Sequence, residues 1–332
     1  MNDQKPVSYL YSDCPNLEGC FDNVEYIHFG NFKDIECDIL ISSRQPAALD
    51  QMVKAKKAYL WVHDIHVGPN NPQMMGWLNK FDKILCLSQW HKDFFLHTYP
   101  ELSAYKVVVT SNGIDLDRFK EQKPKKNWLM FPSSANRGLR QMLSMLPEIR
   151  KKVPDAELHV YYGFQTWMKI AQMNNNQAEI NEIAWYQKTM NETPGVVYHG
   201  RVNQKELTDA WLQSKVWAYP TDFTETSCIS AMESQAAGCV PVTSALAALK
   251  ETVKEGFLIP PYQKQEDVPR YREQFISDVV KLLTDDELRE FYANRCRKQA
   301  QQFAWVDVAK SWLKMFDEDP KSISIPTFQE AA

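Results

Sequence analysis

The sequence predicts an α/β protein built from two doubly wound lobes that face each other across a cleft. Two successive series of short apolar segments carry this prediction, and helix-compatible stretches separate the segments. The segments are continuous rather than alternating, as strands are when both faces of a parallel sheet are buried. A charged stretch at 120–127, which contains Pro124, separates the two series and predicts a linker. Strands that alternate with helices in this way predict doubly wound sheets.

The first series predicts five strands. They are VEYIHF (24–29), CDILISS (37–43), AYLWVH (58–63), KILCLS (83–88) and KVVVTS (106–111). Ahead of them lies VSYLYSDCPNLEGC (7–20), which is either a divergent first strand-helix unit or what remains of a trimmed one. The first lobe is therefore assigned to residues 1–122, with an abbreviated start as one alternative.

The second series predicts five further strands. They are NWLMFPSS (127–134), AELHVYYG (156–163), GVVYHGR (195–201), VWAYP (216–220) and CVPVTS (239–244). From about Tyr271 the pattern is helical, with Phe275, Val279, Leu282 and Leu283 on one face. We assign the second lobe to residues 123–300 and a final helix and tail to residues 301–332.

Composition and charge exclude several classes of protein. The 332 residues can bury two cores, and 44% apolar with 24% charged residues is ordinary for a globular protein. A net charge of −4 argues against a nucleic-acid partner, which would need a concentrated basic face. Seven scattered cysteines without a C-x-x-C pair suit a reducing compartment. With neither a signal peptide nor an apolar span in the sequence, we expect a cytoplasmic protein.

The segment ETSCISAMESQAAGCVPV (225–242) predicts a helix with identifiable ends. Thr224, Thr226 or Ser227 can accept a hydrogen bond from an amide of the first turn, and Gly238 is suited to a left-handed terminator. Glu225 and Glu233 stand eight positions apart around the helix start, a spacing of about 12 Å if all eight residues are helical.

This arrangement suits a sugar-diphosphate ligand. A helix start carries free amides and about half a positive charge, so it binds phosphate, while Glu233 can offer a carboxylate to hydroxyls. The alternative is an ordinary amphipathic helix whose acids face solvent. The flanking sequence decides between the two interpretations.

The flanks resemble a known family. The run WAYPTDFTETSCISAMESQAAGCVPVTS (217–244) is similar to the donor-site segment of retaining GT-B glycosyltransferases of family 4, the group 1 glycosyltransferases. NGIDLDRF (112–119) resembles the end of that family's first domain, FPSSANRGL (131–139) its diphosphate loop, and GVVYHGRVNQKEL (195–207) a later strand and turn. The tail LLTDDELREFYANRCRKQAQQFAWVDVAKSW (282–312) resembles its closing helices, the last of which crosses back to the first lobe.

The resemblance implies two Rossmann-like lobes and a retaining hexosyltransferase. It places Glu225 near the transferred hexose and Glu233 at the ribose hydroxyls of a nucleotide-diphosphate sugar. Thr226, Ser227 and Cys228, at the helix start, complete the contacts to the donor. No metal and no other cofactor is expected, because the helix start and an arginine supply the positive charge.

Arg137 is the candidate cation for the departing diphosphate. It lies in the turn after a buried strand, with Ser133 and Ser134, where a guanidinium can grip phosphate oxygens. The alternative is a surface ion pair or a capping role. Many family members carry a second cation where this chain has Pro132, so we expect Arg201 or the serine hydroxyls to supply the missing donor.

His63 and Gly163 are weaker candidates. His63 follows a predicted strand and resembles the first-lobe polar group near the transferred sugar; the alternative is a buried, hydrogen-bonded histidine. His63 and His66 have a spacing that a metal can use, but a third ligand is not evident. Gly163 resembles the turn against which the base packs, and turn geometry alone explains a glycine there equally well.

We therefore expect transfer of a hexose from a nucleotide-diphosphate sugar to an acceptor such as a glycan, a lipid-linked sugar or a protein. The alternative is a catalytically silent GT-B module that binds nucleotide or glycan. Arg44 and Gln45, after the second strand, are candidates for acceptor contacts. The basic runs KAKK (54–57) and KPKK (123–126) are candidates for membrane contact, although such runs are usually solvated surface.

Overall fold

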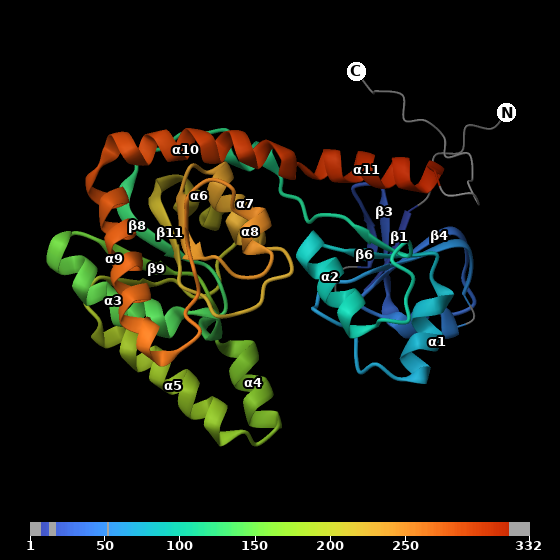
Figure 1. The fold of residues 1–332 in the computed structure, drawn as a ribbon. Coiled ribbons are helices and arrows are strands. Elements are labelled where there is room, and N and C mark those ends of the chain that lie inside the picture. Colours follow the sequence, from blue (N-terminus) through green and yellow to red (C-terminus); the bar gives the residue numbers. More distant parts are fainter. Residues whose placement is uncertain (1–7, 13–17, 52, 319–332) are drawn as a thin grey trace. The chain divides into compact units, whose positions relative to one another are not determined.

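The computed structural model describes residues 8–12, 18–51 and 53–318. The described residues divide into two compact units (Figure 1). The first holds the described residues up to Leu87, with His91–Thr110 and those from Ala309 on; the second holds Ser88–Trp90 and Ser111–Val308. The lobe boundaries placed at residues 122 and 300 from the sequence stay predictions.

The first unit contains a four-stranded parallel sheet of order β4-β5-β6-β7. Its elements are β4 (Glu36–Ser43), β5 (Lys54–Trp61), α1 (Pro72–Lys80), β6 (Lys83–Cys86), α2 (Gln89–Thr98) and β7 (Val107–Val109). Side chains alternate between the two faces of β5: Leu60 packs with residues of α1 and α2, whereas Tyr59 packs on the opposite side. A short 3-10 helix, Pro46–Asp50, joins β4 to β5 in place of a crossover α-helix.

The prediction for residues 24–29 is wrong in one respect. They form β3 (Val24–His28), but this strand belongs to a separate sheet, parallel to β1 (Ser8–Ser12) and antiparallel to β2 (Gly19–Phe21). No residue of β3 is fully buried, because this strand is not inside the four-stranded sheet. In the described part of this unit the first α-helix is α1. The segment 7–20 was interpreted as a divergent or trimmed first unit. Its residues 7 and 13–17, which include Cys14, lie outside the described residues.

The second unit contains a six-stranded parallel sheet of order β10-β9-β8-β11-β12-β13. Its strands are β8 (Lys126–Phe131), β9 (Glu157–Val160), β10 (Val196–Tyr198), β11 (Ser214–Tyr219), β12 (Val240–Ser244) and β13 (Phe257–Ile259). Its helices are α3 (Leu139–Lys152), α4 (Gln165–Met173), α5 (Gln177–Glu192), α6 (Gln204–Gln213), α7 (Ile229–Ala236), α8 (Leu249–Thr252), α9 (Val268–Thr284) and α10 (Asp286–Ala300).

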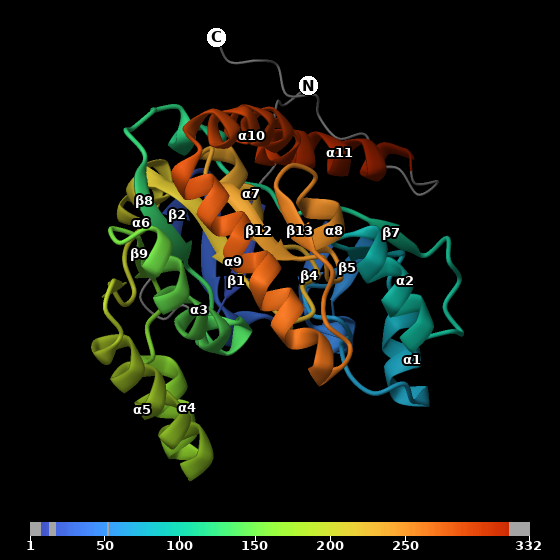
Figure 2. The same ribbon diagram turned by 60° about the vertical axis from the view of Figure 1, so that its left-hand side comes forward.

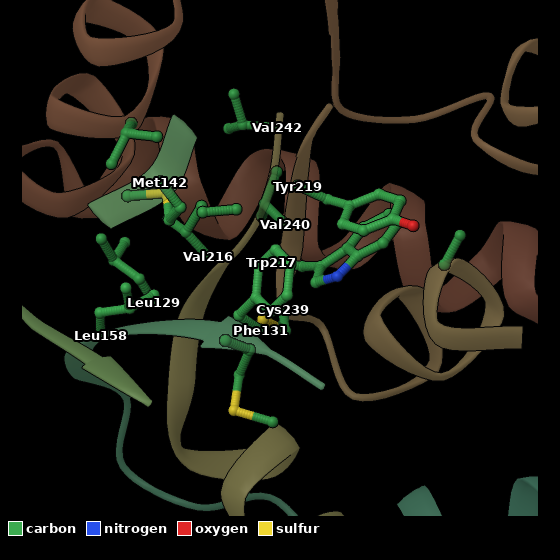
Figure 3. Close-up of a cluster of buried hydrophobic side chains, with 14 of the residues drawn as sticks. Leu129, Phe131, Met142, Leu158, Val216, Trp217, Tyr219, Cys239, Val240 and Val242 are labelled. Atoms are coloured by element: carbon green, nitrogen blue, oxygen red, sulfur yellow. The ribbon is translucent and has the colours of Figure 1, made fainter. Parts of the chain in front are cut away.

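The core of the second unit lies on both faces of this sheet. Val216, Trp217 and Tyr219 of β11 are fully buried, so consecutive side chains are covered on opposite faces, as the continuous apolar pattern predicted. Figure 3 shows these side chains beside Val240 of β12. Helices α3 and α9 pack against each other beside the sheet, as Figure 2 shows, and α7 packs against β12 and α10.

Helix α11 (Trp305–Glu318) connects the two units. Its residues from Ala309 on belong to the first unit, where Trp312 packs on Trp61 and Phe316 packs on Tyr59, with ring centroids 5.0 and 4.9 Å apart. Lys57, which is 1% exposed, donates to the Phe316 carbonyl near the end of the helix. The predicted return of the C-terminal helix to the first lobe is confirmed.

The described helices include none with the length and apolarity that a membrane crossing requires. The two basic runs are less exposed than expected. Lys57 is buried, and Lys125 donates to the carbonyls of Trp211 and Ala237, at distances of 3.3 and 2.9 Å. Each run therefore has one lysine that serves the fold.

Candidate functional site

Most of the predicted donor residues follow the carboxyl ends of neighbouring strands in the second unit. Arg137 follows β8, Gly163 follows β9, Arg201 follows β10 and Glu225 follows β11. These strands are parallel and adjacent in the order β10-β9-β8-β11. The residues are therefore at one edge of the sheet, the edge where doubly wound sheets bind ligands.

Gly138 lets the turn after β8 approach the turn after β11. It has φ +115°, a conformation that side chains with a Cβ rarely adopt. A Cβ at this position would lie 2.5 Å from the carbonyl oxygen of Pro220. The glycine therefore permits a close backbone contact, and this contact holds Arg137 next to the loop that carries Glu225.

Arg137 and Glu225 form an ion pair at this edge. Arg137 Nη1 lies 3.1 Å from Glu225 Oε1, and the Tyr219 hydroxyl donates to the same oxygen at 2.7 Å. The Glu225 side chain is 8% exposed and that of Arg137 is 37% exposed. The guanidinium also lies over the ring of Phe223, with Cζ 3.9 Å from the centroid. In the described part of the chain Glu225 Oε2 accepts no hydrogen bond, so it is available to a ligand.

The predicted capping of α7 is wrong. Its N-cap is Cys228 and no side chain caps it, because the helix begins two to five residues after Thr224, Thr226 and Ser227. Thr226, Ser227 and Cys228 are instead buried in the loop before the helix. Burial raises the pKa of the Cys228 thiol well above its ordinary value. The hydroxyl of Ser227 is buried without a hydrogen-bond partner among the described residues.

The other end of α7 is as predicted. Gly238 has φ +63°, its amide donates to the Gln235 carbonyl, and the Cys239 amide donates to that of Ser234. This is the pattern of a glycine-terminated helix. Since Glu225 precedes the helix and only Glu233 is within it, the helical separation of about 12 Å expected from eight residues does not apply.

Glu233 is held by two side chains that the sequence interpretation missed. Arg118 Nη1 donates to Glu233 Oε1 at 3.0 Å, and Trp211 Nε1 donates to Oε2 at 3.2 Å. Burial raises the pKa of Glu233, and the charge of Arg118 and both hydrogen bonds oppose this rise. Arg118 is itself fixed by Thr208 Oγ1, 2.7 Å from Nη2, and by Gln204 Oε1, also at 2.7 Å.

The signal for these partners is weak in the sequence. Arg118 is part of the quoted NGIDLDRF segment, but 115 residues separate it from Glu233. Tyr219 reads as one more apolar residue of a buried strand, although its hydroxyl reaches Glu225. A buried tyrosine near the end of a strand usually has a partner for its hydroxyl, and this is the one available clue.

The remaining donor candidates of the second unit lie nearby in the fold. A Cβ on Gly163 would lie 3.1 Å from Cβ of Arg201, so the structure brings these two residues together. The Ser134 carbonyl accepts from the amide of Arg137 at 3.0 Å. The hydroxyls of Ser133 and Ser134 make no hydrogen bond within the described part of the chain.

His63 lies in the first unit, two residues after β5. Burial lowers its pKa, the charge of Arg44 lowers it further, and Asp64 opposes both. Arg44, which has φ +66°, pairs with Asp64 at 3.3 Å. Residues after β4 and β5 thus form a small charged cluster beside His63.

The described residues contain no group of three or more His, Cys, Asp or Glu side chains arranged to hold a metal ion. The expectation that no metal or other cofactor takes part stays a prediction.

The chain is similar to a protein family and to solved structures. Residues 126–285 match the family described as Glycosyl transferases group 1. TarM of S. aureus is 13% identical with a TM-score of 0.61; the alignment covers 84% of this chain and 55% of TarM. Sucrose-phosphate synthase from Thermosynechococcus elongatus is 15% identical with a TM-score of 0.64. The alignment covers 84% of this chain and 73% of the synthase.

HepE of Anabaena, solved in complex with UDP-glucose, is 14% identical with a TM-score of 0.61; 84% of this chain and 78% of HepE are covered. The chain spans little more than half the length of TarM. No curated protein matches it in sequence. At these identities the solved structures establish the fold, which is GT-B. The similarity to the group 1 glycosyltransferases extends from β8 to α9.

Proposed function

We propose that the chain transfers a hexose from a nucleotide-diphosphate sugar to a carbohydrate-containing acceptor, which is a glycan, a lipid-linked sugar or a protein. The observation that carries this proposal is the pair of Arg137 and Glu225, 3.1 Å apart at the carboxyl edge of the second sheet. The arginine offers positive charge to a departing diphosphate, and the free carboxylate oxygen offers an acceptor to sugar hydroxyls.

Neighbouring groups fit the two ends of such a donor. The amides at the start of α7, beside Glu225, favour phosphate oxygens. Glu233 is a carboxylate held in a fixed orientation by Arg118, which suits the vicinal hydroxyls of a ribose. HepE of Anabaena was solved with UDP-glucose, and TarM of S. aureus with UDP and alpha-GlcNAc-glycerol, which supports a nucleotide-sugar donor and a carbohydrate acceptor here.

We further propose that transfer retains the anomeric configuration and needs no metal. Arg137 supplies the charge that a divalent ion would otherwise supply. His63 would then position the sugar from the first unit rather than act as an in-line base. The cytoplasmic location expected from the sequence stays a prediction.

A panel of UDP-, GDP- and ADP-sugars tests the proposal. One donor class should raise the melting temperature of the pure protein, and the same donor should be consumed when glycan or lipid-linked acceptors are added in the presence of EDTA. The NMR coupling constant of the new glycosidic bond should report retention. Stabilisation by nucleotide without transfer to any acceptor would support the alternative, a catalytically silent GT-B module. If no nucleotide or nucleotide sugar binds, the transferase interpretation is wrong, and if no glycan binds either, the silent module is wrong as well.

A further inference from the structure

A charged cavity of about 160 Å³ lies at the end of the second sheet opposite the candidate donor site. Lys125, in its wall, directly precedes β8, and Ala237 directly follows α7, so the cavity is near the amino-terminal ends of the strands. The donor candidates follow the carboxyl ends of these strands. The charged wall residues are Glu121, Lys123, Lys125, Arg289, Glu290 and Arg297. About 10–15 Å³ accommodates one water, so this space holds a small ion with several waters.

The wall has more cations than carboxylates, although both of its arginines are paired, Arg289 with Asp286 and Glu290, and Arg297 with Glu290. Its six charged side chains are four cations and two carboxylates. Glu290 is shared by the two arginines: Arg289 Nη1 donates to one carboxylate oxygen at 3.0 Å, and Arg297 Nη1 to the other at 3.1 Å. Lys123 pairs with Asp209 at 2.6 Å. Among the described residues, Lys125 has no carboxylate partner.

Several donors in this wall are unused. Lys125 Nζ donates to the carbonyls of Trp211 and Ala237, which leaves one of its three N–H groups. In the described part of the chain, Nη2 of Arg289 and both Nε and Nη2 of Arg297 donate to no acceptor. The side chains of Arg289 and Arg297 are only 10% and 25% exposed. These nitrogens are not among the buried atoms that lack a partner, so they are open to the cavity and can donate to an ion that enters from solvent.

Gly238 lets Arg297 reach this position. A Cβ on Gly238 would lie 2.6 Å from both Nε and Nη2 of Arg297. The glycine that ends α7 therefore also allows the guanidinium to lie against the backbone. Because residue 238 has no side chain, the unused N–H groups of Arg297 can stay beside the cavity.

The charged groups of the wall also affect the pKa of Lys125. The pKa of Lys125 is lowered to about 8, mainly by burial; Arg297 and Arg289 contribute to the lowering, and Cys239 and Glu290 oppose it. The carbonyls at the ends of α6 and α7 contribute negative partial charge, but Lys125 donates to one carbonyl of each end. What remains toward the cavity is the unused N–H groups of the two arginines and of the lysine.

We propose that this cavity binds a phosphate-class anion, either inorganic phosphate or a small phosphate monoester, through Lys125, Arg289 and Arg297. Two guanidinium groups and an ammonium surround a tetrahedral oxyanion with charge-assisted hydrogen bonds. The site is separate from the one proposed for the donor, so either can be wrong without the other.

The test is calorimetric titration of inorganic phosphate into the full chain at pH 7 and constant ionic strength. Saturable binding should persist in Arg137→Ala, which removes the donor-site cation. Arg297→Gln should weaken phosphate binding about tenfold or more. Arg295→Gln is the matched control, because Arg295 lies on the same helix but pairs with Glu255 at 2.6 Å. Glycerol 3-phosphate, titrated in the same way, distinguishes a monoester site from one for free phosphate.

Arg289→Gln provides a second variant if Arg297→Gln does not fold, as judged by its melting curve. The proposal is overturned if the unmodified protein shows no saturable phosphate binding, if Arg137→Ala abolishes the binding, or if folded Arg297→Gln or Arg289→Gln binds phosphate as the Arg295→Gln control does.

Discussion

Arg118 and Glu233 form an ion pair across 115 residues of sequence, with Nη1 and Oε1 3.0 Å apart. The Glu233 side chain is 9% exposed and that of Arg118 is 25% exposed. The pair joins the segment after the first series of strands to the middle of α7. Helix α7 also starts beside Glu225, and we assign this helix to donor binding. The ion pair therefore fixes the carboxylate of Glu233 within the proposed donor site.

Arg118→Met should destabilise the protein by about 1–3 kcal/mol at pH 7, because it leaves Glu233 buried without its cation. Loss of the cation raises the pKa of Glu233 further above that of an unfolded glutamate, so the folded state holds more protons. The destabilisation should therefore shrink as the pH is lowered toward 5. Urea unfolding of Arg118→Met, Glu233→Gln and the double variant measures the coupling. Additive effects of the two substitutions would show that the pair is not coupled.

Substitutions of Glu225 and Glu233 should affect different properties of the protein, namely turnover and nucleotide affinity. Glu233→Gln should weaken binding of the free nucleotide and of the donor alike, because the carboxylate is assigned to the ribose. Glu225→Gln should spare nucleotide affinity and mainly lower kcat, because its free oxygen is assigned to the hexose. Calorimetry with the nucleotide and steady-state kinetics separate the two. Equal losses of nucleotide affinity would mean that one of the two residues is misassigned.

Gly138→Ala should destabilise the second unit by about 2–4 kcal/mol, because its φ of +115° strains a side chain and the new Cβ meets the Pro220 carbonyl at 2.5 Å. Gly76→Ala is the control. Gly76 is within α1, and a Cβ there has no neighbour within 4 Å, so that substitution should stabilise by roughly 0.5–1 kcal/mol. Differential scanning calorimetry measures both. An unchanged transition in Gly138→Ala contradicts the close approach.

His159 should make stability fall at acid pH. Its pKa is lowered from 6.5 to about 4, mainly by burial, although the hydrogen bond that its Nε2 donates to Glu157 opposes the shift. Below pH 6.5 His159 is protonated in the unfolded chain, whereas in the folded chain it stays neutral until about pH 4. The free energy of unfolding therefore declines between these pH values by up to about 3 kcal/mol. His159→Gln should flatten the decline in urea unfolding between pH 7 and 4.5. The exposed His97, changed to Gln, should leave it unaltered.

Most strands of the two series, the C-terminal helices and the glycine end of α7 could be predicted because each depends on local pattern, but the three-residue strand β13 was not predicted. Continuous apolar runs specify buried strands wherever the sheet is completed by its neighbours, as in β8 and β11. The same reasoning failed at β3, since a run such as VEYIHF does not reveal which sheet it joins. Sheet membership depends on pairing between distant segments.

Part of the candidate site could also be proposed from the sequence. The residue types and sequence positions of Arg137 and Glu225 indicate a site for phosphate and sugar, and the structure brings the two side chains together. Arg118 and Tyr219 could not be assigned, because their partners are fixed by tertiary contacts. The start of α7 was misplaced because Thr226 and Ser227 are good capping residues by type, but both are buried in the preceding loop.

Calorimetric titration of the nucleoside diphosphate into Arg137→Ala, beside the unmodified protein, tests the central claim most directly. Arg140→Ala is the matched control: it removes the same charge three residues further on, where Arg140 lies over Trp185 and pairs with Glu182. Arg137→Ala should lose roughly 1.5–3 kcal/mol of binding free energy and Arg140→Ala almost none. Equal affinity of Arg137→Ala and the unmodified protein would contradict the assignment of this edge of the sheet to a diphosphate.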